Sequence, residues 1–248
     1  MISLNNISVV FGKGTPLQNQ VLHQLNLKIN SGEFVTVIGG NGAGKSTLMN
    51  LLSGEISIDE GNIILDNIEV TRWPTYKRAQ LISRVFQDPL LGSYADLTIE
   101  ENLSLAWSRG KKRTLKIALH RSNREYFQER LADIGIGLEN RLTDKIGLLS
   151  GGQRQAISLI MATLQPSKIL LLDEHTAALD PKMERLILEL TERLIQEKQL
   201  TALMITHCMS QALEFGTRTL VMHQGKIMRD LKDAERNALK ASDLMTFF

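Results

Sequence analysis

Hydrophobic and polar residues alternate along several short segments near the start of the chain. The alternation is clearest at residues 25–30, and it predicts a strand with one buried face; residues 62–66 and 82–86 indicate further strands. Residues 34–38 form instead a continuous apolar run, which is typical of a buried parallel strand, and residues 46–52 predict a helix directly after it. The first third of the chain therefore predicts an antiparallel sheet beside a strand, a loop and a helix.

From about residue 89 the apolar period changes to that of a helix. Residues 99–107 and 124–134 place apolar side chains three and four positions apart, with no strand-like run between them. Strands at 168–173, 201–206 and 219–222 then alternate with helices at 183–197 and 210–215. We expect one α/β domain: a mostly parallel, doubly wound core from 1–88 and 151–230, a helical insertion at 89–150, and a weakly helical tail at 231–248.

Composition narrows the class of protein. A chain of 248 residues suits one large α/β domain with a modest insertion, and a net charge of +2 with 23% charged residues makes no case for nucleic-acid binding. Cys208 is the only cysteine, which excludes an internal disulfide and fits a reducing compartment. The sequence shows neither a signal peptide nor about 18 uninterrupted apolar residues. We expect a cytosolic chain that another polypeptide must hold if it works at a membrane.

A glycine-rich loop lies between the buried strand at 34–38 and the helix that follows. Glycines let successive backbone N–H groups converge on one point, and a helix N-terminus adds positive potential there, so the loop is suited to a polyphosphate. Lys45 would reach the β- and γ-phosphates and Ser46 would hold Mg²⁺. A plain strand-closing turn is disfavoured by the Lys-Ser ending. The candidate phosphate-binding residues are Gly39, Asn41, Gly42, Ala43, Gly44, Lys45, Ser46 and Thr47.

Three ionisable residues follow two later strands. Asp173 ends a run of aliphatic residues, where it would hold Mg²⁺ at the carboxyl edge of a parallel sheet. Glu174 is suited to accept a proton from an attacking water, or to orient that water. His207 follows the strand at 201–206 and would hydrogen-bond the γ-phosphate. The alternatives are a solvated turn for the carboxylates and an ordinary surface histidine for His207.

Two further motifs point to coupling and to a partner chain. Gln87 lies where the core meets the helical insertion, so its amide could contact Mg²⁺ and water while its backbone acts as a hinge. Ser150, Gly151, Gly152 and Gln153 open an apolar helix and form a second anion-binding turn. Because one chain already has a phosphate loop, we expect this turn to serve a partner's nucleotide in a head-to-tail dimer with two ATP molecules at the interface.

In their order, these motifs resemble those of the ATP-binding cassette (ABC) family over residues 2 to about 230. The resemblance implies a P-loop NTPase (RecA-like) core with an antiparallel β subdomain and an inserted α-helical subdomain. It also implies ATP and Mg²⁺ as cofactors, catalytic roles for Glu174, His207, Gln87 and Lys45, and a nucleotide contact from Asp180. By the same resemblance Phe11 stacks on adenine, its π-face serving as well as that of the commoner tyrosine. The alternative for Phe11 is a core residue at a strand end.

Departures from the family's usual wording suggest a subfamily. His175 stands where proline is usual, Ala177 where serine is usual, and Met161 where arginine is usual. The wording resembles ATPases of bacterial importers that have a substrate-binding lipoprotein and a permease akin to branched-chain amino-acid systems. This resemblance implies a peripheral subunit at the cytoplasmic face of the membrane, driving import of a small solute such as an amino acid. The alternatives are a lipid or lipopolysaccharide export or extraction motor and an ABC ATPase without a transport role.

A basic run is the one strong charge cluster. One interpretation is a solvated loop without a specific function. The functional interpretation is contact with anionic lipid headgroups or with a permease loop. A nucleic-acid patch is disfavoured because no aromatic residue is interleaved in the run. The run consists of Arg109, Lys111, Lys112, Arg113, Lys116, Arg121 and Arg124.

Overall fold

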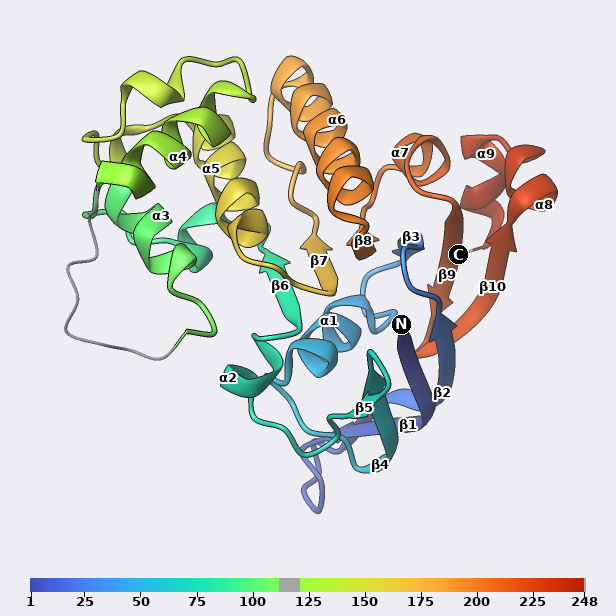
Figure 1. Ribbon diagram of the computed structural model, residues 1–248. Helices are drawn as coiled ribbons and strands as arrows, with labels where there is room; N and C mark the ends of the chain where they lie inside the picture. The colour runs from blue at the N-terminus through green and yellow to red at the C-terminus, as the bar shows by residue number, and fades with distance from the viewer. Residues whose placement is uncertain (112–120, 248) are drawn as a thin grey trace.

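Two β-sheets packed on helices form the molecule (Figure 1), and the computed structural model describes residues 1–111 and 121–247. The antiparallel sheet has the order β2-β1-β4-β5 and the larger sheet the order β10-β9-β3-β8-β7-β6. All neighbours in the larger sheet are parallel except β10 and β9. The strands are β1 (Ile2–Phe11), β2 (Asn19–Ile29), β3 (Phe34–Gly39), β4 (Glu60–Leu65), β5 (Ile68–Glu69), β6 (Ile82–Val85), β7 (Ile169–Asp173), β8 (Thr201–Ile205), β9 (Arg218–His223) and β10 (Lys226–Lys232).

The helices divide between the two faces of the larger sheet and its margins (Figure 1). They are α1 (Lys45–Ser53), α2 (Thr75–Arg78), α3 (Ile99–Trp107), α4 (Arg121–Ala132), α5 (Gly151–Leu164), α6 (Pro181–Lys198), α7 (Met209–Glu214), α8 (Asp233–Asn237) and α9 (Ala241–Leu244). Short 3₁₀ turns lie at Pro89–Gly92, Leu138–Asn140, Ile146–Leu148 and Met245–Phe247. Within the described residues, no helix is both long and apolar enough to cross a bilayer.

Alternate side chains of the central strands enter two different cores. In β7, Leu170 and Leu172 join the cluster formed with α3 to α6, whereas Ile169 and Leu171 join the cluster formed with α1 and the antiparallel sheet. Side chains of a strand point alternately to its two faces, so a strand covered on both faces must be apolar at every position. This is why the central strands appear in the sequence as continuous apolar runs.

The carboxyl end of α1 is held by a buried arginine from α2. Arg78 is 1% exposed, and its guanidinium donates to the carbonyls of Leu51 at 2.5 Å and Leu52 at 3.1 Å. It also donates to the carbonyls of Trp73 and Thr71. The last carbonyls of a helix lack partners within the helix, so this arginine satisfies groups that would otherwise be buried unpaired.

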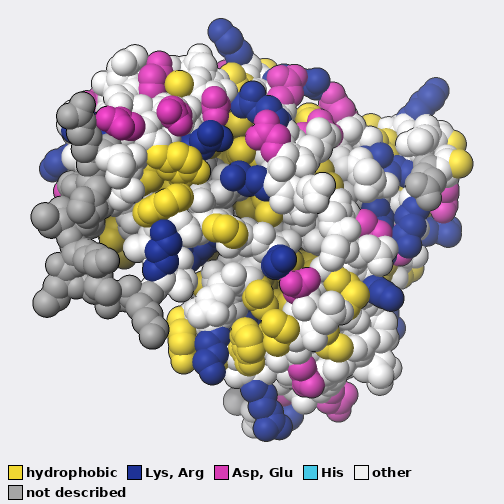
Figure 2. All heavy atoms as spheres, in the orientation of Figure 1, with side chains coloured by type: hydrophobic (Ala, Val, Ile, Leu, Met, Phe, Trp, Pro, Cys, Tyr) yellow, Lys and Arg dark blue, Asp and Glu magenta, His cyan; other side chains and the backbone are white. Residues whose placement is uncertain are grey.

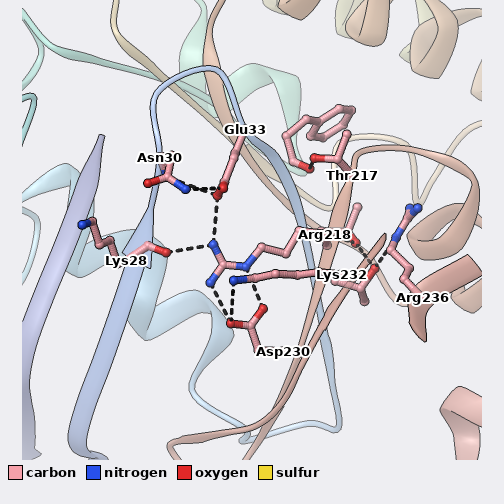
Figure 3. A network of polar contacts seen from close by, with 11 residues as sticks. Lys28, Asn30, Glu33, Thr217, Arg218, Asp230, Lys232 and Arg236 are labelled. Carbon is pink, nitrogen blue, oxygen red and sulfur yellow. Dashed lines mark hydrogen bonds and ion pairs between the residues drawn. The ribbon is translucent and has the colours of Figure 1, made fainter. Parts of the chain in front are cut away.

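A second buried arginine joins the two sheets (Figure 3). Arg218 at the start of β9 donates to both carboxylate oxygens of Asp230 on β10, at 2.7 and 2.8 Å. It also donates to Glu33, in the turn before β3, and to the carbonyl of Lys28 on β2. The partner strand β10 is an addition to the predicted fold, because the sequence indicated no strand after residue 222. Only Leu231 of β10 is buried, so this edge strand lacks the apolar pattern of the central ones.

Candidate functional site

Strand order brings the predicted chemical groups to one edge of the larger sheet. Strands β3, β8 and β7 are consecutive neighbours, and Ile205 of β8 is paired with both Val37 of β3 and Asp173 of β7. The three strands are parallel, so the residues that follow this row emerge together at the carboxyl edge. Asp173 lies in this row, and the phosphate loop, Glu174 and His207 follow it, as ligand sites do in open α/β sheets.

Glycine geometry shapes the phosphate loop. Gly42 and Gly44 have φ values of 75° and 96°, which L-residues with side chains rarely adopt. A Cβ at Gly44 would also lie 2.9 Å from Cδ2 of Leu22. Gly44 is the N-cap of α1, and Ser46 is exposed in the first turn of that helix. The loop therefore presents its amides and the Ser46 hydroxyl at the N-terminus of a nine-residue helix.

Lys45 is folded back onto its own loop. Its Nζ donates to the carbonyls of Gly39 at 2.6 Å and Gly40 at 3.0 Å, and the residue is 6% exposed. Burial lowers the pKa of Lys45, and the nearby charges of Glu174 and Asp173 partly oppose that shift. Among the described residues no carboxylate forms an ion pair with this buried ammonium, so it is well suited to exchange its carbonyl partners for phosphate oxygens.

Glu174 and His207 are in direct contact. Nε2 of His207 lies 2.7 Å from Oε1 of Glu174, with the histidine side chain 48% and the glutamate side chain 15% exposed. Glu174 has φ of 48°, and its backbone N–H donates to the carbonyl of Ile205 at 3.1 Å. At Glu174 the left-handed backbone turns the chain out of the strand direction, and the carboxylate meets His207, two residues after the end of β8. The predicted proton acceptor and the predicted γ-phosphate contact therefore face each other.

Asp173 makes an ion pair that the sequence analysis did not predict. Arg84 of β6 contacts Asp173 at 2.6 Å, Glu55 at 2.8 Å and the side-chain oxygen of Asn50 at 2.8 Å. Its guanidinium also stacks 4.7 Å from the ring centroid of Phe86. The signal in the sequence was a single charged residue inside the short strand Ile82–Val85, which has to find a partner if it is buried.

Gln87 lies two residues after the end of β6 and is exposed, as a ligand to an incoming metal or water would be. The preceding carbonyl, that of Phe86, accepts a hydrogen bond at 3.1 Å from Nε2 of Gln155, a buried residue of α5. Gln155 was not among the predicted site residues. It ties the helix that begins at the Ser150 turn to the backbone beside Gln87, so displacements of the two are linked.

The second anion-binding turn lies apart from the phosphate loop. Ser150 is the exposed N-cap of α5, and it exchanges hydrogen bonds with Gln153 in a capping box. Within residues 1–111 and 121–247, no hydrogen bond or ion pair joins this turn to the loop at 39–47. Figure 1 likewise shows α5 and α1 in different parts of the molecule. Gly151 is exposed and Gly152 is buried against Met183 of α6.

Two remaining site candidates have clear local roles. Asp180 is the N-cap of α6, its Oδ1 accepting from the amides of Lys182 and Met183. Phe11 ends β1 and is 44% exposed, so the alternative that it is a core residue is wrong. Its ring is available to stack on a base.

His175, the residue that replaces the usual proline, is a core residue. It is 2% exposed, and its Nε2 lies 3.1 Å from the Thr191 hydroxyl of α6. That hydroxyl donates to the carbonyl of Ile187, so it can accept the histidine proton. Burial lowers the pKa of His175 to about 4, which keeps the ring neutral at physiological pH.

The described part of the basic run is not a free charged surface. Arg109 donates to the carbonyls of Ala162 and Gln165 at the end of α5, and burial lowers its pKa. Lys111 stacks 4.1 Å from the Trp107 ring centroid, and Arg124 pairs with Glu100 at 3.4 Å. The interpretation as a solvated loop is therefore wrong for Arg109. Residues 112–120 and the Arg121 side chain lie outside the described residues.

The oxygen donors fit a magnesium ion held mainly by phosphate. Among the described residues no group of three or more His, Cys, Asp or Glu side chains is arranged to hold a metal by itself. Ser46, Gln87 and Asp173 offer a hydroxyl, an amide and one carboxylate, which are hard oxygen ligands. Mg²⁺ at nucleotide sites typically uses one or two protein ligands and completes its shell with phosphate and water.

Comparison with known proteins identifies the family. The ABC transporter family model matches residues 22–177. A tyrosine transport ATP-binding protein of Clostridioides difficile is 44% identical and aligns over 100% of this chain and 98% of its own length. The thiamine import ATP-binding protein ThiQ of Shigella sonnei is 34% identical, over 92% of this chain and 93% of that protein.

Solved structures agree with this assignment. The dimeric ABC transporter cassette MJ0796 matches with a TM-score of 0.81 and 30% identity, covering 94% of this chain and 98% of that one. The dimeric post-hydrolysis state of MJ0796 bound to ADP and Pi has a TM-score of 0.80. The chain therefore belongs to the ABC transporter family. It is an ATP-binding and ATP-hydrolysing subunit, and the predicted cassette fold with its antiparallel β and helical subdomains is confirmed.

Proposed function

We propose that this subunit powers import of tyrosine or a closely related small solute through a membrane permease, as a homodimer that binds two Mg-ATP at its interface. The transported solute is inferred from the 44% identity, over essentially full length, to a tyrosine transport ATP-binding protein. Other relatives named for spermidine/putrescine, thiamine and xylose/arabinose import also favour import over lipid export or a non-transport role.

The arrangement at the sheet edge supports a hydrolytic role for each residue. Lys45 leaves the carbonyls of Gly39 and Gly40 to neutralise the β- and γ-phosphates. Glu174 accepts a proton from the attacking water, and His207, in contact with Glu174, donates to the γ-phosphate and holds the water in line. Phe11 stacks on adenine. Mg²⁺, held by Ser46, Gln87 and Asp173, would neutralise phosphate charge as the terminal phosphoryl group is transferred.

Separation of the two anion-binding elements supports a shared site. Ser150, Gly151, Gly152 and Gln153 are displaced from the phosphate loop of their own chain, yet Ser150 and Gly151 are exposed at a helix N-terminus. They are available to a second protomer's ATP, with Asp180 at the same interface. The dimeric structure of the MJ0796 cassette supports the same arrangement.

A groove beside Gln87 supports docking of a permease. It encloses about 490 Å³ between α2, the Gln87 loop, α3 and α5, with apolar lining from Leu105 and Met161 and aromatic side chains at Tyr76 and Tyr94. Hydrophobic and basic side chains gather on this face of the molecule (Figure 2). An amphipathic permease helix seated there would contact the elements that hold Gln87 and would keep this subunit at the cytoplasmic face of the membrane. A branched-chain-amino-acid-like permease, together with a substrate-binding lipoprotein outside, is the assembly that we propose.

Uptake of radiolabelled tyrosine tests this function. Cells that lack the chain should regain tyrosine uptake with the unmodified gene and not with Glu174→Gln, because that variant binds ATP but loses the proton acceptor. Labelled thiamine serves as the control solute. Equal tyrosine uptake with and without the chain would refute the cargo, and full uptake with Glu174→Gln would refute the role of Glu174.

A further inference from the structure

A buried arginine from the carboxyl-terminal segment holds the helix that follows His207. Arg236 of α8 is 7% exposed. Its Nη2 donates to the carbonyls of Ala212 at 3.0 Å and Phe215 at 2.7 Å, which are at the end of α7, and its Nε donates to the Thr219 hydroxyl at 3.0 Å. A guanidinium at a helix carboxyl end satisfies carbonyls that have no partner within the helix. Arg236 thus fixes the end of α7 to β9, close to the Arg218 network in Figure 3.

The Ala212 carbonyl also contacts β3, the strand that leads to the phosphate loop. The Thr36 hydroxyl of β3 and the Thr219 hydroxyl of β9 each lie 2.9 Å from the Ala212 carbonyl, and 2.9 Å from each other. Both threonines are fully buried. A charged donor and two hydroxyls at one acceptor in a buried site fix its position more firmly than any one of them would.

Apolar contacts from the tail support the same helix. Leu244 of α9 is buried in one cluster with Ala212 and with Ile38 of β3, and Leu239 and Phe247 pack against that cluster. The tail therefore packs against α7 and covers Ala212.

The other end of α7 carries the His207 loop. The Thr206 hydroxyl donates to Oε1 of Gln211 in α7 at 2.9 Å, and the backbone N–H of Cys208 donates to the Thr206 hydroxyl at 3.0 Å. His207 lies between these two residues. Nε2 of Gln211 donates to Glu184 of α6 at 2.6 Å. The backbone on both sides of His207 is thus tied to α7, so a shift or rotation of α7 displaces the imidazole.

We propose that Arg236 is a positioning residue for ATP hydrolysis, which holds α7 so that His207 meets Glu174 and the γ-phosphate. The proposal rests on the role of His207 in the proposed function. It assigns to the tail a task in the reaction, although Arg236 touches neither ATP nor the reacting atoms. Displacing one catalytic group by about 1 Å can cost up to about 100-fold in rate, so a remote anchor can matter greatly.

Steady-state kinetics of Arg236→Met give the first test. We expect kcat for ATP hydrolysis to fall about ten-fold with KM for ATP unchanged, because the phosphate loop is left intact. Arg229→Met is the matched control: Arg229 is an exposed arginine of β10 with its guanidinium 5.6 Å from the Phe247 ring centroid. An unchanged kcat in Arg236→Met, or the same loss in Arg229→Met, would overturn the proposal.

Cys208 supplies a readout that does not depend on turnover. It is the only cysteine in the chain, it is exposed, and it adjoins His207. Its rate of reaction with a chromogenic disulfide reagent reports the state of the His207 loop. We expect Arg236→Met to change that rate several-fold at a temperature where circular dichroism shows the protein fully folded, and Arg229→Met to leave it unchanged. An unchanged rate in Arg236→Met contradicts the positioning role.

A double variant separates this proposal from the role of His207 itself. If Arg236 acts through His207, Arg236→Met combined with His207→Ala should hydrolyse ATP no more slowly than His207→Ala alone. If the losses in kcat of the two single variants add in the double variant, the proposal is overturned. Full activity of His207→Ala would refute the role of His207. In that case the reaction rate of Cys208 decides whether Arg236 positions the His207 loop. If Arg236→Met does not fold, Arg236→Lys replaces it. Lysine offers one donor nitrogen where arginine uses two, Nε toward Thr219 and Nη2 toward Ala212 and Phe215, so it cannot reproduce this geometry. The kcat should therefore fall severalfold, and an unchanged kcat is the contrary result.

Discussion

At the scale of single residues, Lys45 and His207 should fail in different ways when replaced. Lys45→Ala removes the side chain placed to neutralise the β- and γ-phosphates, so ATP affinity and turnover should both be lost. His207→Ala should keep ATP affinity but lose about 100-fold or more in kcat, the scale expected for one transition-state contact. Fluorescent-nucleotide binding and phosphate release measure the two effects. Hydrolysis at the unmodified rate in His207→Ala would show that its contact with Glu174 has no part in catalysis.

His175 predicts an acid limit to stability. Its folded-state pKa of about 4 lies below the ordinary value of 6.5 because of burial, so the unfolded chain binds its proton more tightly. The contribution of His175 to the free energy of unfolding is therefore fully present above about pH 6.5. About 3 kcal/mol is lost as the pH falls from there through 4. Urea unfolding of His175→Gln should show a flatter dependence on pH between 4 and 6.5.

The control for this titration is His23→Gln, which changes a half-buried histidine outside the site. It should keep the pH dependence of the unmodified protein. An unchanged slope in His175→Gln would mean that other groups cause the acid loss.

Residue types with a fixed chemical task were predictable from the sequence, and buried polar partners were not. Lys45, Asp173, Glu174 and His207 follow strands whose apolar runs are plain, so their meeting at one edge follows from parallel topology. The Arg84 pair with Asp173 and the Gln155 bond to Phe86 depend on which strands and helices become neighbours. Single-chain periodicity does not contain that information.

At the scale of elements, the anchoring of α1 gives a stability prediction. Arg78→Met removes the donors to four carbonyls, two of them at the end of the helix that starts at Lys45. Leaving buried acceptors unpaired should lower the free energy of unfolding by about 3 kcal/mol, measured by urea denaturation. Arg72→Met, at an exposed position in the same segment, should change it by less than about 0.5 kcal/mol. A similar small change in Arg78→Met would show that the helix end does not need this anchor.

The helices and strands differed in how well they could be predicted from the sequence. Strands β3, β7 and β8 are buried on both faces and appear as apolar runs, so they were predicted to within a residue or two. Strand β10 is held by pairing with β9 and by the Arg218 to Asp230 ion pair, not by a repeating apolar face. Its existence depends on a neighbouring edge and a buried cation, and neither can be seen in the local pattern.

At the scale of the whole molecule, the Ser150 turn predicts nucleotide-dependent dimerisation. The free protein should be largely monomeric and should dimerise with ATP, because the ligand completes the interface. Ser150→Arg forces bulk and charge into that contact, so this variant should bind ATP yet neither dimerise nor hydrolyse it. Light scattering and phosphate release measure both. Full activity of Ser150→Arg as a monomer would rule out a shared site.

Mixing variants sharpens the same prediction. In a heterodimer of Ser150→Arg with Lys45→Ala, both lesions fall in one composite site, and the other site keeps an intact Lys45 and an intact Ser150. ATPase activity should therefore recover in part on mixing. Lys45→Ala alone at the same total concentration is the control. Activity there would show that recovery does not require a partner chain with an intact Lys45.

The row Val37, Ile205 and Asp173 across three parallel strands also limits how this chain can change in length. One extra residue after Ile205 would push His207 about 3.3 Å along the strand direction and turn it to the opposite face of the sheet. Length changes should therefore be excluded at these three strand ends and permitted at exposed turns such as the one at Gly135. Inserting a glycine after Ile205 should abolish ATP hydrolysis, whereas one after Gly135 should preserve most of it. In descendants of this sequence, insertions and deletions would accumulate at such exposed turns and not along that line.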